Sequence, residues 1–111
     1  MNDKYILNEQ GEPVPEPDLI KWGRWFQEQS RRCVVKQEQI GNVKVSTAFL
    51  GLNYRFVGKG PPILWESMTF SSVKKLDGFQ ARCSGTRENA MSMHNRMVER
   101  VKEAQKKKGQ K

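Results

Sequence analysis

The sequence has few residues that could bind a metal ion or attack a substrate. Its 111 residues include two cysteines and one histidine, namely Cys33, Cys83 and His94. The cysteines lie 50 positions apart and in no CxxC arrangement, so we expect two buried, reduced thiols in a cytosolic chain. A tetrahedral zinc site would need a carboxylate besides these three side chains, and no spacing suggests one. We therefore expect neither a metal site nor a cofactor.

Long hydrophobic runs are also missing. Apolar stretches are interrupted within about five residues, whereas a membrane-spanning helix needs ~20. No basic region followed by an apolar block stands at the N-terminus, so no secretory signal is predicted. We expect a cytoplasmic protein with no membrane partner. The length is that of a single domain with one modest core.

Acidic residues are scarce outside the first part of the chain. Residues 1–18 hold one basic residue and five acidic ones, for a net charge of −4, and residues 96–111 hold seven basic and two acidic residues, for +5. The whole chain carries +8. An excess of this size favours contact with an anion such as nucleic acid.

Hydrophobic periodicity predicts one helix followed by an antiparallel sheet. Residues 4–15 begin as a short strand and then turn, and residues 17–30 form an amphipathic helix that begins at Pro17 and has Asp18 in its first turn. Its apolar residues at helical spacing are Leu19, Ile20, Trp22, Trp25 and Phe26. The two tryptophans are expected to be core anchors.

β-Branched and aromatic residues then predict the sheet strands. Gly41 and Asn42 form the two-residue loop of a hairpin. In the strand after this loop one face carries Val43, Val45, Thr47 and Phe49. A third strand begins after Pro62, because proline is tolerated at the start of a strand, and FQARC at residues 79–83 forms a fourth.

A second helix is predicted after Thr86, which can cap it, with Glu88 in its first turn. One apolar stripe of this helix consists of Ala90, His94, Met97, Val98 and Val101. Past Ala104 the chain has nothing to bury, so residues 105–111 are predicted to be a disordered basic tail. The expected fold is α+β: a single domain at residues 1–104, with an antiparallel sheet of four strands, or five with the N-terminal segment, and two helices packed on one face.

The stretch NYRFVGKGPP at residues 53–62 is the candidate binding element. A phosphate-binding P-loop needs GxxxxGK followed by Ser or Thr and a helix, but Lys59 is followed by Gly60 and two prolines, which lack amide donors and prevent a helix there. The stretch is instead a long hairpin connection. Loops on rigid scaffolds often carry binding residues, and the ones predicted here are Tyr54, Arg55, Phe56 and Lys59.

No set of residues predicts catalysis. CSGTR at residues 83–87 resembles a cysteine phosphatase loop, but that loop needs an arginine six positions after the cysteine, where this chain has Asn89. A nucleophilic thiol also needs a base, and His94 lies on the apolar stripe, where a buried structural role is favoured. Glu38 and Glu66 lie on separate strands and cannot be paired from sequence. We expect a protein that is not an enzyme.

Residues 43–70 read VKVSTAFLGLNYRFVGKGPPILWESMTF. They combine a VSTxFLGL strand, an aromatic and glycine-rich loop ending in Pro-Pro, and a strand of the L-[FW]-E-[ST]-M-x-F type. The stretch resembles a family of small proteins common in tailed-phage and prophage genomes, and the likeness extends upstream to PVPEPDLIKWGRWF and downstream to AMSMHNRMVERV. The resemblance implies a viral or prophage origin and an accessory role, and brings no catalytic residues. The basic loop residues Arg55 and Lys59 and the lysine-rich tail depart from the family pattern.

The function expected from these features is that of a non-catalytic phage accessory protein. It binds a host protein or a nucleic-acid complex through the loop and the basic surface, with inhibition of a host defence system as one purpose. The alternative is a protein that binds a nucleotide or another small anion with Arg55 and Lys59. The tail residues expected to contact nucleic acid are Lys106, Lys107, Lys108 and Lys111.

Overall fold

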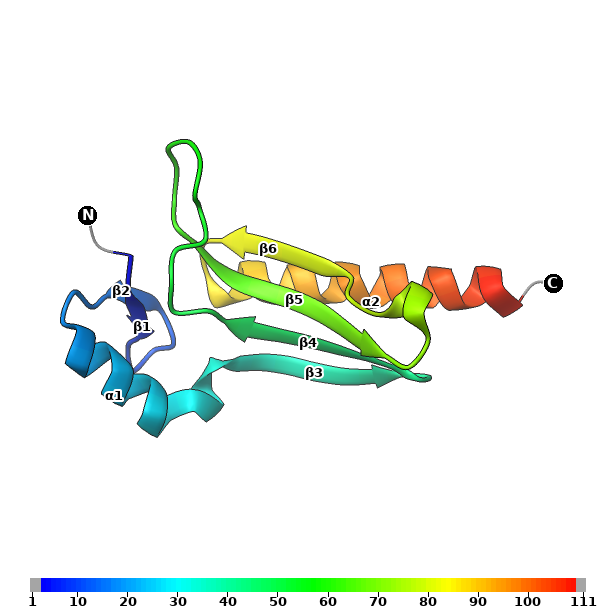
Figure 1. Ribbon diagram of the computed structural model, residues 1–111, viewed down its shortest axis with the longest axis horizontal. Coiled ribbons are helices and arrows are strands. Elements are labelled where there is room, and N and C mark those ends of the chain that lie inside the picture. The colour runs from blue at the N-terminus through cyan, green and yellow to red at the C-terminus, as the bar shows by residue number, and fades with distance from the viewer. Residues whose placement is uncertain (1–2, 110–111) are drawn as a thin grey trace.

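The computed structural model describes residues 3–109 and, in that range, an α+β fold with two antiparallel sheets. β1 and β2 form a two-stranded sheet, and the four-stranded sheet has the order β3-β4-β5-β6 (Figure 1). The predicted fold class is confirmed. In chain order the elements are β1 (Tyr5–Leu7), β2 (Pro13–Pro15), α1 (Leu19–Gln29), the 3-10 turn η1 (Ser30–Cys33), β3 (Val34–Ile40), β4 (Val43–Phe49), β5 (Ile63–Ser71), the 3-10 turn η2 (Lys74–Leu76), β6 (Gln80–Ser84) and α2 (Arg87–Gly109).

The four-stranded sheet follows the turn residues read from the sequence. Ile40 pairs with Val43 across the predicted loop, and Gly41 has a φ of 61°, which a glycine at the first loop position adopts without strain. β5 begins directly after Pro62, as predicted. The N-terminal segment does not add a fifth strand to this sheet, because β1 pairs with β2 instead. The sequence does not predict β2.

α2 covers one face of the four-stranded sheet and contacts all four of its strands (Figure 1). The strand residues predicted to share that face are buried, with Val43, Val45 and Thr47 fully inaccessible. Every member of the predicted helix stripe is buried as well. Alternation along β4 and helical periodicity along α2 therefore produce the main core.

α2 is longer than the sequence suggested. Thr86 Oγ1 accepts a hydrogen bond from the Asn89 backbone N–H at 3.3 Å, so the predicted cap is present. The helix then continues to Gly109 instead of giving way to a disordered tail after Ala104. Gln105 explains part of the difference, since its Nε2 donates to the Ile40 carbonyl at 2.7 Å, and lysine is a good helix former.

α1 packs at one end of the sheet against β1, and does not lie across the sheet face as α2 does (Figure 1). Asp18 is its N-cap, with Oδ1 accepting from the N–H groups of Ile20 and Lys21 at 2.9 and 3.1 Å, so the helix begins two residues later than predicted. Trp25 and Phe26 reach the core at Phe49, where the Phe26 ring is stacked on the Phe49 ring and the Trp25 ring meets it edge-on. No residue of α1 is fully buried, and Leu19 and Ile20 are 65% and 71% exposed, contrary to the expectation of an apolar core face.

Gly51 joins this N-terminal part to the sheet. Its carbonyl accepts hydrogen bonds from the Tyr5 N–H at 2.8 Å and from the Trp22 indole Nε1 at 3.1 Å. Its φ is 75°, and a Cβ at this position would lie 2.0 Å from Cζ of Phe26. Only glycine fits, because any side chain would meet the aromatic ring that anchors α1 and would also strain the backbone.

We predict that Gly51→Ala lowers the free energy of unfolding by about 2 to 5 kcal/mol, from steric overlap with Phe26 and left-handed strain together. Urea denaturation followed by circular dichroism measures the change. Gly23→Ala is the matched control: Gly23 is helical, has no atom within 4 Å of an added Cβ and no positive φ, so this variant should gain up to ~1 kcal/mol. Equal effects of the two substitutions would contradict the role given to Gly51.

Candidate binding site: the 53–62 loop and the groove at its foot

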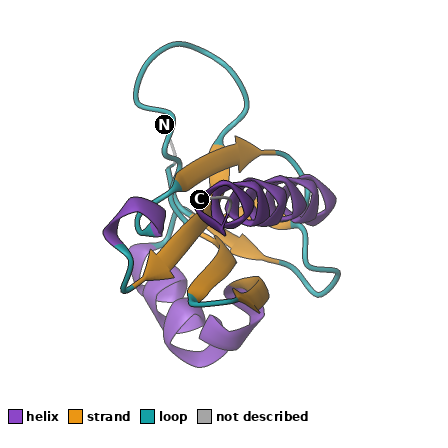
Figure 2. Cartoon of the chain, turned by 90° about the vertical axis from the view of Figure 1, so that its right-hand side faces the viewer, coloured by secondary structure: helices purple, strands orange, loops and turns teal. Residues whose placement is uncertain are grey.

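The 53–62 loop between β4 and β5 projects from the body of the protein (Figures 1 and 2). Its two ends are tied together by Asn53, whose Oδ1 accepts from the N–H groups of Arg55 and Ile63 at 2.9 and 3.0 Å. The Tyr54 N–H also donates to the Ile63 carbonyl at 2.9 Å. The loop therefore stands on a hydrogen-bonded base.

The cations and aromatic rings predicted as binding residues have different environments. Arg55 Nε donates to the Pro61 carbonyl at 2.9 Å, so this side chain braces the loop from within. The Tyr54 ring lies 4.7 Å from the Arg82 guanidinium carbon and 5.7 Å from the Phe56 ring, and is half-buried. Lys59 is exposed at the tip.

Apolar surface is concentrated at the tip of the loop. Phe56 is 79% exposed and the neighbouring Val57, which the sequence reading did not select, is 87% exposed. All four predicted residues therefore lie in one projecting loop. Tyr54 and Arg55 support the loop, whereas Phe56 and Lys59 are exposed to solvent together with Val57.

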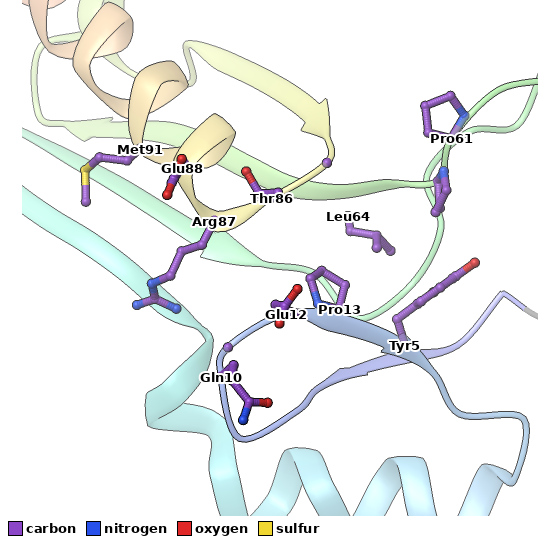
Figure 3. Close-up of a pocket in the computed structure, with 13 residues that line it drawn as sticks. Tyr5, Gln10, Glu12, Pro13, Pro61, Leu64, Thr86, Arg87, Glu88 and Met91 are labelled. Carbon is purple, nitrogen blue, oxygen red and sulfur yellow. The ribbon is translucent and has the colours of Figure 1, made fainter.

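A groove with a volume of about 810 Å³ lies at the foot of the loop (Figure 3). Three parts of the chain form it: the β1–β2 hairpin, the last loop residues with the start of β5, and the first turns of α2. Its apolar wall residues are Tyr5, Pro13, Pro61, Pro62, Leu64 and Met91. The sequence does not predict the groove, because its lining residues meet only after the β1–β2 hairpin has packed at the end of the sheet. Pro61 and Pro62 are the one local sign of an apolar surface here.

Two carboxylates border the groove. Glu12 comes from the hairpin and Glu88 from the first turn of α2, and both side chains are exposed (Figure 3). Arg87 also lines the groove, but its guanidinium donates to the carbonyls of Arg32 and Val34 at 3.4 and 3.1 Å. The groove accordingly combines apolar walls with acidic edges.

His94 belongs to a chain of polar side chains between α2 and the sheet that is buried except at Glu38, whose side chain is 30% exposed. Its Nδ1 lies 2.7 Å from Thr47 Oγ1, which also contacts Ser67 Oγ, and its Nε2 lies 2.8 Å from Glu38 Oε1. A hydrolase triad also joins a hydroxyl, an imidazole and a carboxylate, but there Nε2 contacts the hydroxyl and Nδ1 the carboxylate, the reverse of the arrangement at His94. Thr47, Ser67 and His94 are all 0% exposed, so these side chains are closed off from solvent. The predicted burial of His94 is confirmed, and the network links α2 to three strands.

Neither thiol has the environment of a reactive cysteine. Both are free; Cys33 is buried and Cys83 is half-buried. Burial raises the pKa of each thiol, and the opposing effects of Arg32 and Arg87 on Cys33, and of Arg96 on Cys83, are smaller. A raised pKa disfavours the nucleophilic thiolate. Within residues 3–109, no three His, Cys, Asp or Glu side chains gather in a way that could hold a metal ion.

Three of the lysines predicted to contact nucleic acid, Lys106, Lys107 and Lys108, belong to the C-terminal end of α2. Lys106 is exposed, the backbones of Lys107 and Lys108 are helical, and Lys111 lies outside the described residues. Among the helices of the described chain, none combines the length and hydrophobicity that crossing a membrane requires.

No protein-family model, curated protein or solved structure matches this chain.

The buried network predicts a pH dependence of stability. The hydrogen bond from His94, followed by that from Lys36, lowers the pKa of Glu38 below its ordinary value of 4.5. A lowered folded-state pKa contributes stability that is complete above about pH 4.5 and is lost as the pH falls through the lower folded value. We expect the stability difference between wild type and Glu38→Gln to shrink between pH 6 and pH 3 in urea titrations. The neutral variant Gln37→Ala, on the same strand, should differ from wild type by a constant amount; a similar constancy for Glu38→Gln would contradict the assignment.

Proposed function

We propose that the protein is a non-catalytic phage accessory protein that binds a macromolecule of the host through the 53–62 loop. The observation that supports this is the exposure of Phe56 and Val57 on a loop whose base is fixed by Asn53. Apolar side chains held in water on a rigid support favour a protein partner, which removes their surface from solvent. Because the supporting hydrogen bonds already order the base, binding loses less conformational entropy than it would with a free loop.

The biological setting is part of the proposal. The resemblance of residues 43–70 to small tailed-phage and prophage proteins supports a viral origin and an accessory role in the host cytoplasm. Inhibition of a host defence system is a purpose that such binding would serve. The absence of solvent contact at Thr47, Ser67 and His94 favours a protein that acts by binding alone.

A small anion held by Arg55 and Lys59 has less support. Arg55 is engaged by the Pro61 carbonyl, Lys59 lies at the exposed tip, and neither residue lines the groove at the foot of the loop. An arginine already bonded to a carbonyl and a solvent-exposed lysine give a nucleotide phosphate little advantage over bulk solvent.

We predict that the double variant Phe56→Ser, Val57→Ser loses the host protein that the wild type captures from lysate, with a melting temperature within about 4 °C of wild type because both residues are exposed. The matched control is Leu19→Ser, Ile20→Ser, which removes another exposed apolar pair, from α1, and should still capture the partner. Quantitative mass spectrometry of nuclease-treated pull-downs compares the three proteins. Retention of the partner by the loop variant would remove the loop from the function.

Nucleic acid is a second candidate partner, favoured by the charge at the far end of α2. That end extends beyond the sheet (Figure 1) and presents exposed Lys102 and Lys106 before the remaining lysines of the chain. Lysines of this kind would contact phosphates and add affinity without reading sequence.

We predict that removing residues 107–111 weakens binding to a 20-base-pair duplex and flattens the log-log salt slope by up to ~2.7, for three lost phosphate contacts. The truncation takes the net charge from +8 to +5 and leaves the Gln105 hydrogen bond to Ile40 in place. Electrophoretic shift titrations at two salt concentrations measure both effects. Identical binding by the two chains would exclude the tail from the interface, and failure of both to bind would count against nucleic acid as a partner.

A further inference from the structure

The groove at the foot of the 53–62 loop lies in the acidic part of a basic protein. Glu12 belongs to residues 1–18, which carry −4 in a chain of +8, and Glu88 is the lining residue from the first turn of α2 (Figure 3). In the described residues neither carboxylate takes part in a salt bridge. Among the groove's lining residues these two carboxylates outnumber the one cation, Arg87, so the lining favours a cationic group over a phosphate.

Hydrogen-bonding capacity at the groove is dominated by acceptors. Three of the wall residues, Pro13, Pro61 and Pro62, have no backbone N–H to donate. Arg87 has two guanidinium nitrogens engaged by carbonyls. The first-turn residues Arg87 and Glu88 of α2 also line the groove, and the carboxylate of Glu88 complements the helix dipole there. An occupant that donates hydrogen bonds fits better than one that accepts them.

The walls suit an extended chain with apolar side chains. Leu64 is 2% exposed and forms the buried side, while Tyr5, Met91 and the proline rings supply flat apolar surface. The volume of about 810 Å³ lies within the ~300–1,000 Å³ typical of ligand sites. Trp65 Nε1 donates to the Gly85 carbonyl at 2.9 Å and fixes the chain just before α2, so one edge is held in place.

We infer that this groove binds an extended peptide segment of the protein partner, in which apolar residues pack on the proline-rich walls and a lysine or arginine reaches Glu12 and Glu88. The inference rests on the proposed function and adds to it a second contact, with a stated chemistry, beside the loop tip. The loop tip supplies apolar contact, and the groove supplies the preference for a basic peptide over a nucleic acid.

The test uses a random library of displayed 12-residue peptides, selected against the full chain. We expect enrichment of peptides with apolar residues and at least one lysine or arginine. Addition of a selected peptide should shift the backbone amide resonances of Gly11, Glu12, Leu64 and Glu88 in ¹H–¹⁵N spectra. No enrichment, enrichment of peptides without a basic residue, or shifts confined to the open face of the sheet would overturn the inference.

Variants separate the carboxylates from general charge effects. Glu12→Gln with Glu88→Gln should weaken the selected peptide about three- to tenfold at low salt, as expected for two partly exposed charge pairs. Glu9→Gln with Glu103→Gln removes the same charge from the same hairpin and helix, outside the groove, and should leave the affinity unchanged. Equal affinities for the two double variants would contradict the proposed contact.

Failure of this inference is distinguishable from failure of the proposed function. Phe56→Ser, Val57→Ser should bind the selected peptide like wild type, since neither residue lines the groove. If the loop variant loses the host partner but the wild-type chain selects no basic peptide, the proposed function stands and the groove contact is rejected. A thymidine 12-mer that shifts the groove amides would assign the groove to nucleic acid and overturn the peptide proposal.

Discussion

The contact between the Phe26 ring and Gly51 determines where the N-terminal part of the chain lies. The missing side chain at Gly51 lets the ring approach, and the same residue's carbonyl accepts hydrogen bonds from Tyr5 and Trp22. β1, β2 and α1 are thereby held at the end of the sheet from which the 53–62 loop projects. The groove depends on this docking, because one of its walls is the β1–β2 hairpin.

The sequence predicts the elements whose pattern is local. β4 alternates strictly and α2 repeats at helical spacing, and the Gly41–Asn42 turn and Pro62 limit the strands where the structure has them. α1 shows the limit of such patterns. Its apolar spacing indicates burial. The helix contacts the rest of the fold through Trp22, Trp25 and Phe26, whereas its first turn, with Leu19 and Ile20, stays exposed.

The candidate site is predictable only in part, for a similar reason. Glycines and prolines marked the 53–62 loop, and the aromatic and basic residues in it were visible. The bracing role of Arg55 depends on its distance to the Pro61 carbonyl, and the groove depends on segments separated by more than 70 positions, Tyr5 to Met91. The sequence predicts a disordered tail after Ala104 because the charge pattern there contains no sign of the hydrogen bond between Gln105 and Ile40, which are far apart in the sequence.

α2 connects the two regions for which partners are proposed. Its first turn borders the groove and its last described side chain, Lys106, lies near the opposite end of the helix. A straight helix separates Glu88 from Lys106 by about 27 Å along its axis. Bivalent attachment then carries a geometric condition: avidity arises only on a target that displays a peptide segment and a phosphate backbone at a matching separation. A ribonucleoprotein or a protein bound to DNA can satisfy this spacing, whereas a free protein or bare nucleic acid can occupy one end alone and dissociates at the rate of that single contact.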